Sequence, residues 1–99
     1  MGLLSSIFGG GISTKADCDR EIARLQGEIE REKAHIARNK STIKGDKEWA
    51  KEYRRRGGNP GHMDFRNLEA GINMSNSIIA EKKARIAELK TMKSSLPKG

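Results

Sequence analysis

An isoleucine recurs at every seventh residue through the first half of the chain. Ile22, Ile29, Ile36 and Ile43 keep this spacing, and Ala50 extends it. The intermediate positions of the same pattern carry further apolar side chains, namely Cys18, Leu25 and Tyr53. A seven-residue apolar repeat is typical of coiled coils, because it places its members along one stripe of a helix. The pattern predicts one long helix over about residues 14–56.

A second heptad pattern follows in the other half of the chain. Phe65, Ile72, Ile79 and Ile86 occupy one seam position. The other seam position mixes apolar and polar side chains, namely Leu68, Ser75, Lys82, Leu89 and Leu96. This pattern predicts a second helix over about residues 62–95. Residues 57–61, with the sequence Gly-Gly-Asn-Pro-Gly, predict a turn between the helices, because glycine favours a left-handed C-cap and proline restricts the residue before it.

Signals at the helix ends agree with this division. Ser13 and Thr14 are candidate N-caps, and Asp17 stands three residues after Thr14 as in a capping box. Gly45 could interrupt the first helix, but the heptad register is unbroken across it, so we expect one continuous helix. Two heptad helices joined by a short loop predict an all-α fold, an antiparallel helical hairpin over residues 12–99.

Folding the chain about the turn predicts which seam positions meet. With the loop centred near Asn59, facing residues have numbers that sum to about 118. Asp46 would then face Ile72, and Asn39 would face Ile79. Several layers of the seam would therefore pair a polar with an apolar side chain, while Gly71 would lie outside the seam.

The supply of core-forming residues is small. The chain has 99 residues, of which 34% are hydrophobic and 33% charged, and its few aromatics and lack of valine argue against a β-sandwich or barrel. Because a two-helix hairpin buries only one stripe of each helix, half-polar layers would leave it marginally stable. We expect copies to oligomerise into a helical bundle, or to bind a larger partner, through Ile22, Leu25, Ile29, Ile36, Ile43, Ile72, Ile79, Ile86 and Leu89.

Residues 1–11 form a short apolar, amphipathic N-terminal segment that ends in a glycine linker. Leu3, Leu4, Ile7 and Phe8 would share one face of a short helix. Two interpretations are open: the segment could dock on a membrane surface or a partner, or it could fold back onto the helices of its own or another copy. An opening of Met-Gly, a short apolar run and three glycines also occurs in small phage and bacterial proteins, without indicating a family.

The charge balance indicates anionic partners. The formal net charge is +7 and the pI is about 9.9, which attracts nucleic acid, anionic membrane surfaces and acidic proteins alike. Arg54, Arg55 and Arg56 lie near Trp49 and Tyr53, a combination suited to phosphates and bases. In the alternative interpretation, the arginines are a solvated helix end and the aromatics form the cluster that closes the hairpin.

Patterns for catalysis or metal binding are lacking in the sequence. His35 and His62 have no partners at metal-ligand spacing, and we expect His35 to face solvent beside the seam. The single cysteine, Cys18, cannot form an intrachain disulfide. A nucleophile motif of the G-x-S-x-G type is not present, and a slim hairpin offers no deep cleft. We therefore expect a protein that is not an enzyme and needs no cofactor.

Together these features predict a self-associating coiled-coil protein. It would act as a structural or protein–protein interaction component of a larger assembly, or as a small inhibitor that binds a partner surface. The alternatives are a peripheral membrane-binding protein that uses its apolar N-terminus, and a basic nucleic-acid-binding module that uses the arginine-rich hairpin tip. The predicted localisation is cytoplasmic, with the membrane periphery or a virion as alternatives, since no apolar run approaches the roughly 20 residues of a membrane span.

Overall fold

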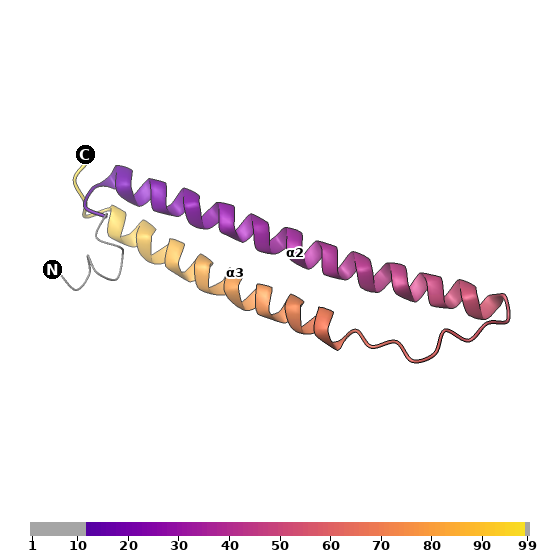
Figure 1. Cartoon of the computed structure of the whole chain (residues 1–99). Coiled ribbons are helices and arrows are strands. Elements are labelled where there is room, and N and C mark those ends of the chain that lie inside the picture. Colours follow the sequence, from indigo (N-terminus) through magenta and orange to yellow (C-terminus); the bar gives the residue numbers. More distant parts are fainter. Residues whose placement is uncertain (1–11, 99) are drawn as a thin grey trace. The chain divides into compact units, whose positions relative to one another are not determined.

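The fold is an all-α hairpin of two helices that pack against each other. The computed structural model describes residues 12–98, and within them it contains α2 (Lys15–Arg55), α3 (Arg66–Lys93) and no strand (Figure 1). The N-terminal segment with Leu3, Leu4, Ile7 and Phe8 lies outside the described residues.

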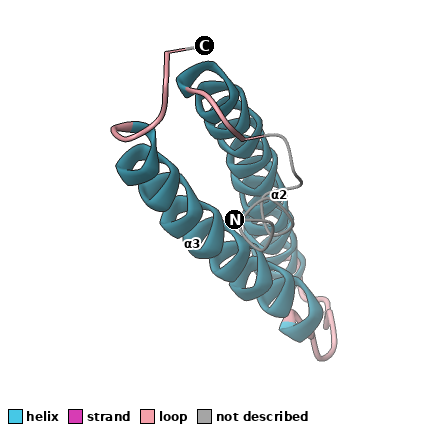
Figure 2. Ribbon diagram, turned by 90° about the vertical axis from the view of Figure 1, so that its left-hand side faces the viewer, coloured by secondary structure: helices cyan, strands magenta, loops and turns pink. Residues whose placement is uncertain are grey.

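The described chain divides into two compact units. Unit 1 comprises residues 12–29 and 80–98, and unit 2 comprises Glu30–Ile79. In each unit a stretch of α2 lies beside a stretch of α3 that runs in the opposite direction (Figures 1 and 2). Each unit therefore has its own share of the helix-to-helix seam.

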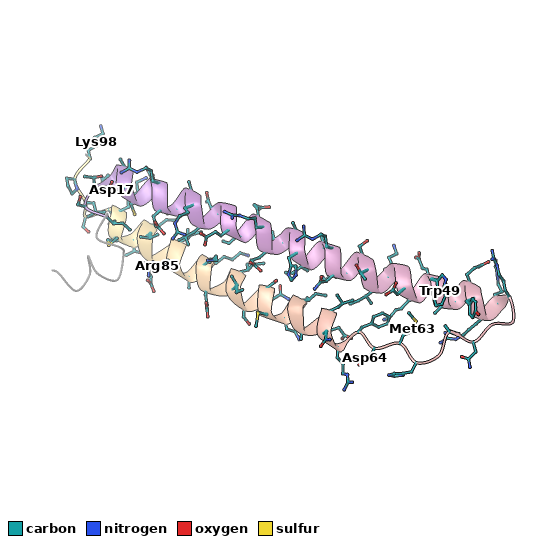
Figure 3. The ribbon with its side chains drawn as sticks, in the orientation of Figure 1. Asp17, Trp49, Met63, Asp64, Arg85 and Lys98 are labelled. Carbon is teal, nitrogen blue, oxygen red and sulfur yellow. The ribbon has the colours of Figure 1, made fainter. Side chains whose placement is uncertain are left out.

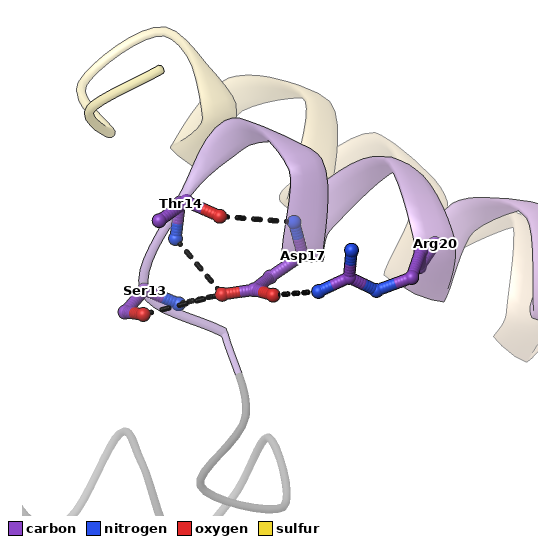
Figure 4. Close-up of polar contacts among 4 residues, drawn as sticks. All are labelled: Ser13, Thr14, Asp17 and Arg20. Carbon is purple, nitrogen blue, oxygen red and sulfur yellow. Dashed lines mark hydrogen bonds and ion pairs between the residues drawn. The ribbon is translucent and has the colours of Figure 1, made fainter. Parts of the chain in front are cut away.

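A capping box starts α2, as the sequence predicts. The Asp17 backbone N–H donates to Thr14 Oγ1 at 3.1 Å, and Asp17 Oδ2 accepts from the Thr14 backbone N–H at 3.2 Å (Figure 4). The same carboxylate accepts bonds from the Ser13 N–H and hydroxyl and pairs with Arg20. These bonds, chiefly the one from the Ser13 N–H, lower the pKa of Asp17. Because they satisfy donors that a helix leaves unpaired at its start, α2 begins at Lys15.

A glycine C-cap ends α2, also as the sequence predicts. Gly57 has a φ of 90°, its N–H donates to the Arg54 carbonyl at 3.0 Å, and the Gly58 N–H donates to the Tyr53 carbonyl at 2.9 Å. This pair of bonds is a Schellman motif. A side chain at Gly58 would overlap the Tyr53 ring. The helix is continuous through Gly45, which confirms that prediction.

The second helix begins later than predicted, at Arg66 instead of about residue 62. The Asn59 side chain accepts a bond from the Gly61 N–H at 3.0 Å, and Asp64 Oδ1 accepts one from the Arg66 N–H at 2.9 Å. The Phe65 carbonyl then accepts the first bond of α3, from the Glu69 N–H at 2.8 Å. Because Asn59 and Asp64 hold the backbone in local turns, the intervening residues do not continue the helix.

The predicted pairing register is wrong by about eight residues. In unit 1, Cys18 Sγ contacts the Leu89 carbonyl at 2.9 Å and Glu28 contacts Lys82 at 2.5 Å. In unit 2, His35 bonds Ser75 at 2.9 Å and Asn39 bonds the Leu68 carbonyl at 3.2 Å. Facing residue numbers therefore sum to about 110, not to about 118.

The connection between the helices explains this difference. Residues 58–65 are not helical, and Met63 and Phe65 lie beside Lys47 and Ala50 of α2. A non-helical chain covers up to about 3.3 Å per residue, whereas a helix rises about 1.5 Å. The connection therefore returns along more than two turns of α2 before α3 begins.

The observed register sets apolar side chains opposite apolar ones, and polar side chains opposite polar ones. In unit 1 it places Ile22 opposite Ile86, and both side chains are buried. In unit 2 it places Ile36 opposite Ile72, and both are half-buried. The predicted pairing of Asn39 with Ile79 is wrong, because Asn39 bonds the Leu68 carbonyl.

Burial is unequal between the units. Among the described residues, the buried hydrophobic side chains of unit 1 are Cys18, Ile22, Leu25, Ile29, Ile86 and Leu89. In unit 2 the buried hydrophobic side chains are only Ala50 and Ile79. Unit 1 therefore holds most of the buried apolar side chains, and unit 2 holds few of them.

Candidate functional site

Unit 2 carries an exposed pair of aromatic rings on α2. Trp49 and Tyr53 stack with their centroids 5.1 Å apart and their planes 17° from parallel, and Figure 3 labels Trp49 on α2. They are 55% and 42% exposed. The two rings therefore do not form a buried cluster, although the Tyr53 ring lies against Gly58 of the turn that follows α2. Together they form an aromatic pair on the surface of α2, one helical turn apart.

The seam of unit 2 contains a polar layer. His35 Nδ1 lies 2.9 Å from Ser75 Oγ, and Ser75 is only 2% exposed. Next to this pair, Asn39 Nδ2 donates to the Leu68 carbonyl, and a Cβ added at Gly71 would lie 2.9 Å from the same nitrogen. His35 therefore points into the seam and Gly71 faces it, contrary to both predictions. The small residues of α3 make room for the polar side chains of α2, which fixes the register of this unit.

The nine apolar residues predicted as an oligomer or partner interface mostly serve the hairpin itself. Six of them are buried within the single chain, namely Ile22, Leu25, Ile29, Ile79, Ile86 and Leu89. The other three, Ile36, Ile43 and Ile72, are half-buried and all belong to unit 2. Any surface left for a partner on the predicted seam therefore lies in unit 2.

The predicted arginine patch at the hairpin tip is partly neutralised. Arg55 and Arg56 pair with the same carboxylate, that of Glu52, at 2.9 and 3.4 Å. Arg54 lies over a shallow depression whose other walls include Ala50 and Phe65. The three arginines are exposed but do not form one unopposed cationic patch.

A row of four lysines lies on one face of α2, and the sequence reasoning did not identify this common face. Lys40, Lys44, Lys47 and Lys51 line one open depression of about 360 Å³ on α2, together with Ile43 and Glu48. We call these four residues the lysine row. The signal in the sequence was their spacing, because residues separated by four, seven and eleven positions share one face of a helix.

The described residues show no metal centre and no membrane-spanning helix. No group of three His, Cys, Asp or Glu side chains in residues 12–98 is placed to hold a metal ion, and neither α2 nor α3 is long and apolar enough to cross a bilayer. Cys18 is buried, and burial raises the pKa of its thiol. This thiol is therefore part of the core of unit 1.

No protein-family model, curated protein sequence or solved structure matches this chain.

Proposed function

We propose that this chain is a non-enzymatic helical hairpin that self-associates through unit 2 and serves as an interaction component of a larger assembly. The observation that carries this proposal is the exposed aromatic pair, Trp49 and Tyr53. Tryptophan and tyrosine are the side chains most enriched at the energetic centres of protein interfaces.

The uneven core supports the same proposal. The large hydrophobic side chains that the described residues leave exposed, Trp49, Tyr53 and Met74, all belong to unit 2. The half-buried seam positions Ile36 and Ile72 belong to it as well. A second copy packed on this unit would complete a core that one copy leaves thin, as in bundles of helical hairpins.

The expected stabilisation is large enough to matter. Trp49 is 55% exposed, so covering it removes roughly 100 Å² of mostly apolar surface from water. At about 25 cal/mol per Å², this corresponds to about 2.5 kcal/mol for each copy. In a two-fold dimer the same contact occurs twice, which offsets much of the loss of translational freedom on association.

The test is the mass of the full chain in solution. Analytical ultracentrifugation and native mass spectrometry at about 10 µM should show a dimer or larger species. The double variant Trp49→Ala/Tyr53→Ala should shift it to monomer with unchanged helical circular dichroism, because both substitutions lie on an exposed helix face. The control is the double variant Lys83→Ala/Lys90→Ala, since it truncates two exposed side chains of α3 that belong to unit 1 and not to unit 2.

Two results would overturn the proposal. One is a wild-type chain that stays a well-folded monomer at this concentration. The other is an oligomer whose mass is unaffected by the aromatic substitutions, which would place the association on a different surface.

A further inference from the structure

The lysine row is laid out as a straight line of positive charge. Steps of four, three and four residues separate its members, so at about 1.5 Å rise per residue the row extends for about 16 Å along α2. All four side chains are exposed and line the same depression. A line of evenly spaced cations is suited to a linear anion.

The charges of the lysine row are little opposed within the described chain. None of its members takes part in an ion pair among residues 12–98, whereas Arg24, Arg55 and Arg66 each pair with a carboxylate close in sequence. The carboxylate that lines the depression is Glu48. Lys47 also lies over the Phe65 ring, with its Nζ 5.5 Å from the ring centroid, which favours one placement of this side chain.

We propose that the lysine row binds the phosphate backbone of a nucleic-acid strand. About five phosphates of one strand lie along a duplex axis of about 16 Å, the length of the row. Because that strand curves around the axis, the ammonium groups reach its phosphates through the flexible four-carbon stems of the lysines. The contact reads charge and not base sequence, since it is made to phosphates.

An anionic membrane is the other surface that a lysine row attracts, and the composition of this face disfavours it. A helix that lies in a bilayer interface inserts several large apolar side chains beside its cations. The apolar side chain in the depression is Ile43, which is half-buried. Trp49 and Tyr53 do not line it. The face therefore carries positive charge but lacks the large exposed apolar side chains that would insert into a bilayer.

The proposal is tested with the full chain and fluorescein-labelled 20-base-pair DNA, by anisotropy over a salt series from about 20 to 200 mM. Four phosphate contacts predict that log K falls with log salt at a slope of about −3.6. Lys44→Gln should lower the magnitude of this slope by about 0.9. Glu48→Gln should instead strengthen binding, because it removes the negative charge beside the row.

A matched pair of variants separates a site from general attraction. One variant replaces the four lysines of the row by glutamine. The control replaces four other exposed lysines, Lys33, Lys83, Lys90 and Lys98, and so has the same net charge. The row variant should lose most of the salt-dependent binding, and the control should keep a slope close to that of the wild type.

Three results would overturn the proposal. An equal loss of DNA affinity in the two variants would show that net charge, and not the lysine row, causes the binding. A wild-type chain that does not bind DNA at the lowest salt would rule out nucleic acid as the partner. Flotation with phosphatidylserine vesicles, without DNA binding, would reassign the row to a membrane. Circular dichroism of each variant verifies that the helices persist.

Discussion

Replacing Leu89 by alanine should destabilise the hairpin more than the corresponding change in unit 2. Leu89 is 0% exposed, and its carbonyl accepts the Cys18 thiol at 2.9 Å, so the two helices meet at this point with no solvent between them. Truncating a fully buried leucine to alanine costs about 3–4 kcal/mol, from lost transfer free energy and from the cavity left behind. This is a large part of the 5–15 kcal/mol that domains of this size retain in total.

The matched control is Ile36→Ala. Like Leu89, Ile36 is a seam residue, but it lies on α2, is half-buried and belongs to unit 2. Because solvent already reaches this side chain, less surface is re-exposed and the cavity opens to water. We expect its truncation to cost about 1–2 kcal/mol.

Urea unfolding at one fixed protein concentration measures both variants, since association would make the midpoint depend on concentration. Helical circular dichroism reports the whole chain, and Trp49 fluorescence reports unit 2. With a slope of about 1.5 kcal/mol per M, Leu89→Ala should lower the midpoint by about 2 M and Ile36→Ala by about 1 M. A shift for Leu89→Ala that is no larger than that for Ile36→Ala would refute the inference that unit 1 holds the core.

Two further predictions concern the capping box and the register. The hydrogen bonds to Asp17 lower the pKa of its carboxylate. Their stabilisation is therefore present above about pH 4 and is lost as the pH falls through the folded-state pKa. In thermal melts, the Tm of the Asp17→Asn variant should fall less than that of the wild type between about pH 5 and 2. Glu28 and Lys82 pair at 2.5 Å with side chains 24% and 26% exposed, so a double-mutant cycle with Glu28→Gln and Lys82→Met should give a coupling of about 0.5–1 kcal/mol. A zero coupling would contradict the pairing of Glu28 with Lys82.

The helix ends could be predicted from the sequence because local bonds decide them. The donors and acceptors that start α2 lie within five residues of one another, from Ser13 to Asp17, and the bonds that end it join Gly57 and Gly58 to the last turn. Such patterns form wherever their residues occur together, without help from the rest of the chain. The late start of α3 depended on Asp64, a local signal that the heptad pattern obscured.

The candidate surfaces were harder to predict because exposure depends on what lies opposite. Tyr53 continues the apolar heptad of the first helix, so the sequence places it in the seam. In the structure, the seam beside this part of α2 is filled by the returning connection, with Met63 and Phe65, and Tyr53 instead stacks on Trp49. The lysine row could be predicted from spacing alone, since a helix face is a local property.

The sequence by itself determined that residues 12–98 form two helices, where the first one begins and ends, and which stripe of each is apolar, because bonds and periodicities within a few residues set these features. Only the tertiary structure decided the register of the seam, the partial burial of His35 and Asn39 and the exposure of Trp49 and Tyr53. The physical reason is the length that a non-helical connection covers per residue, about twice that of a helix. A few such residues shift every contact that follows them.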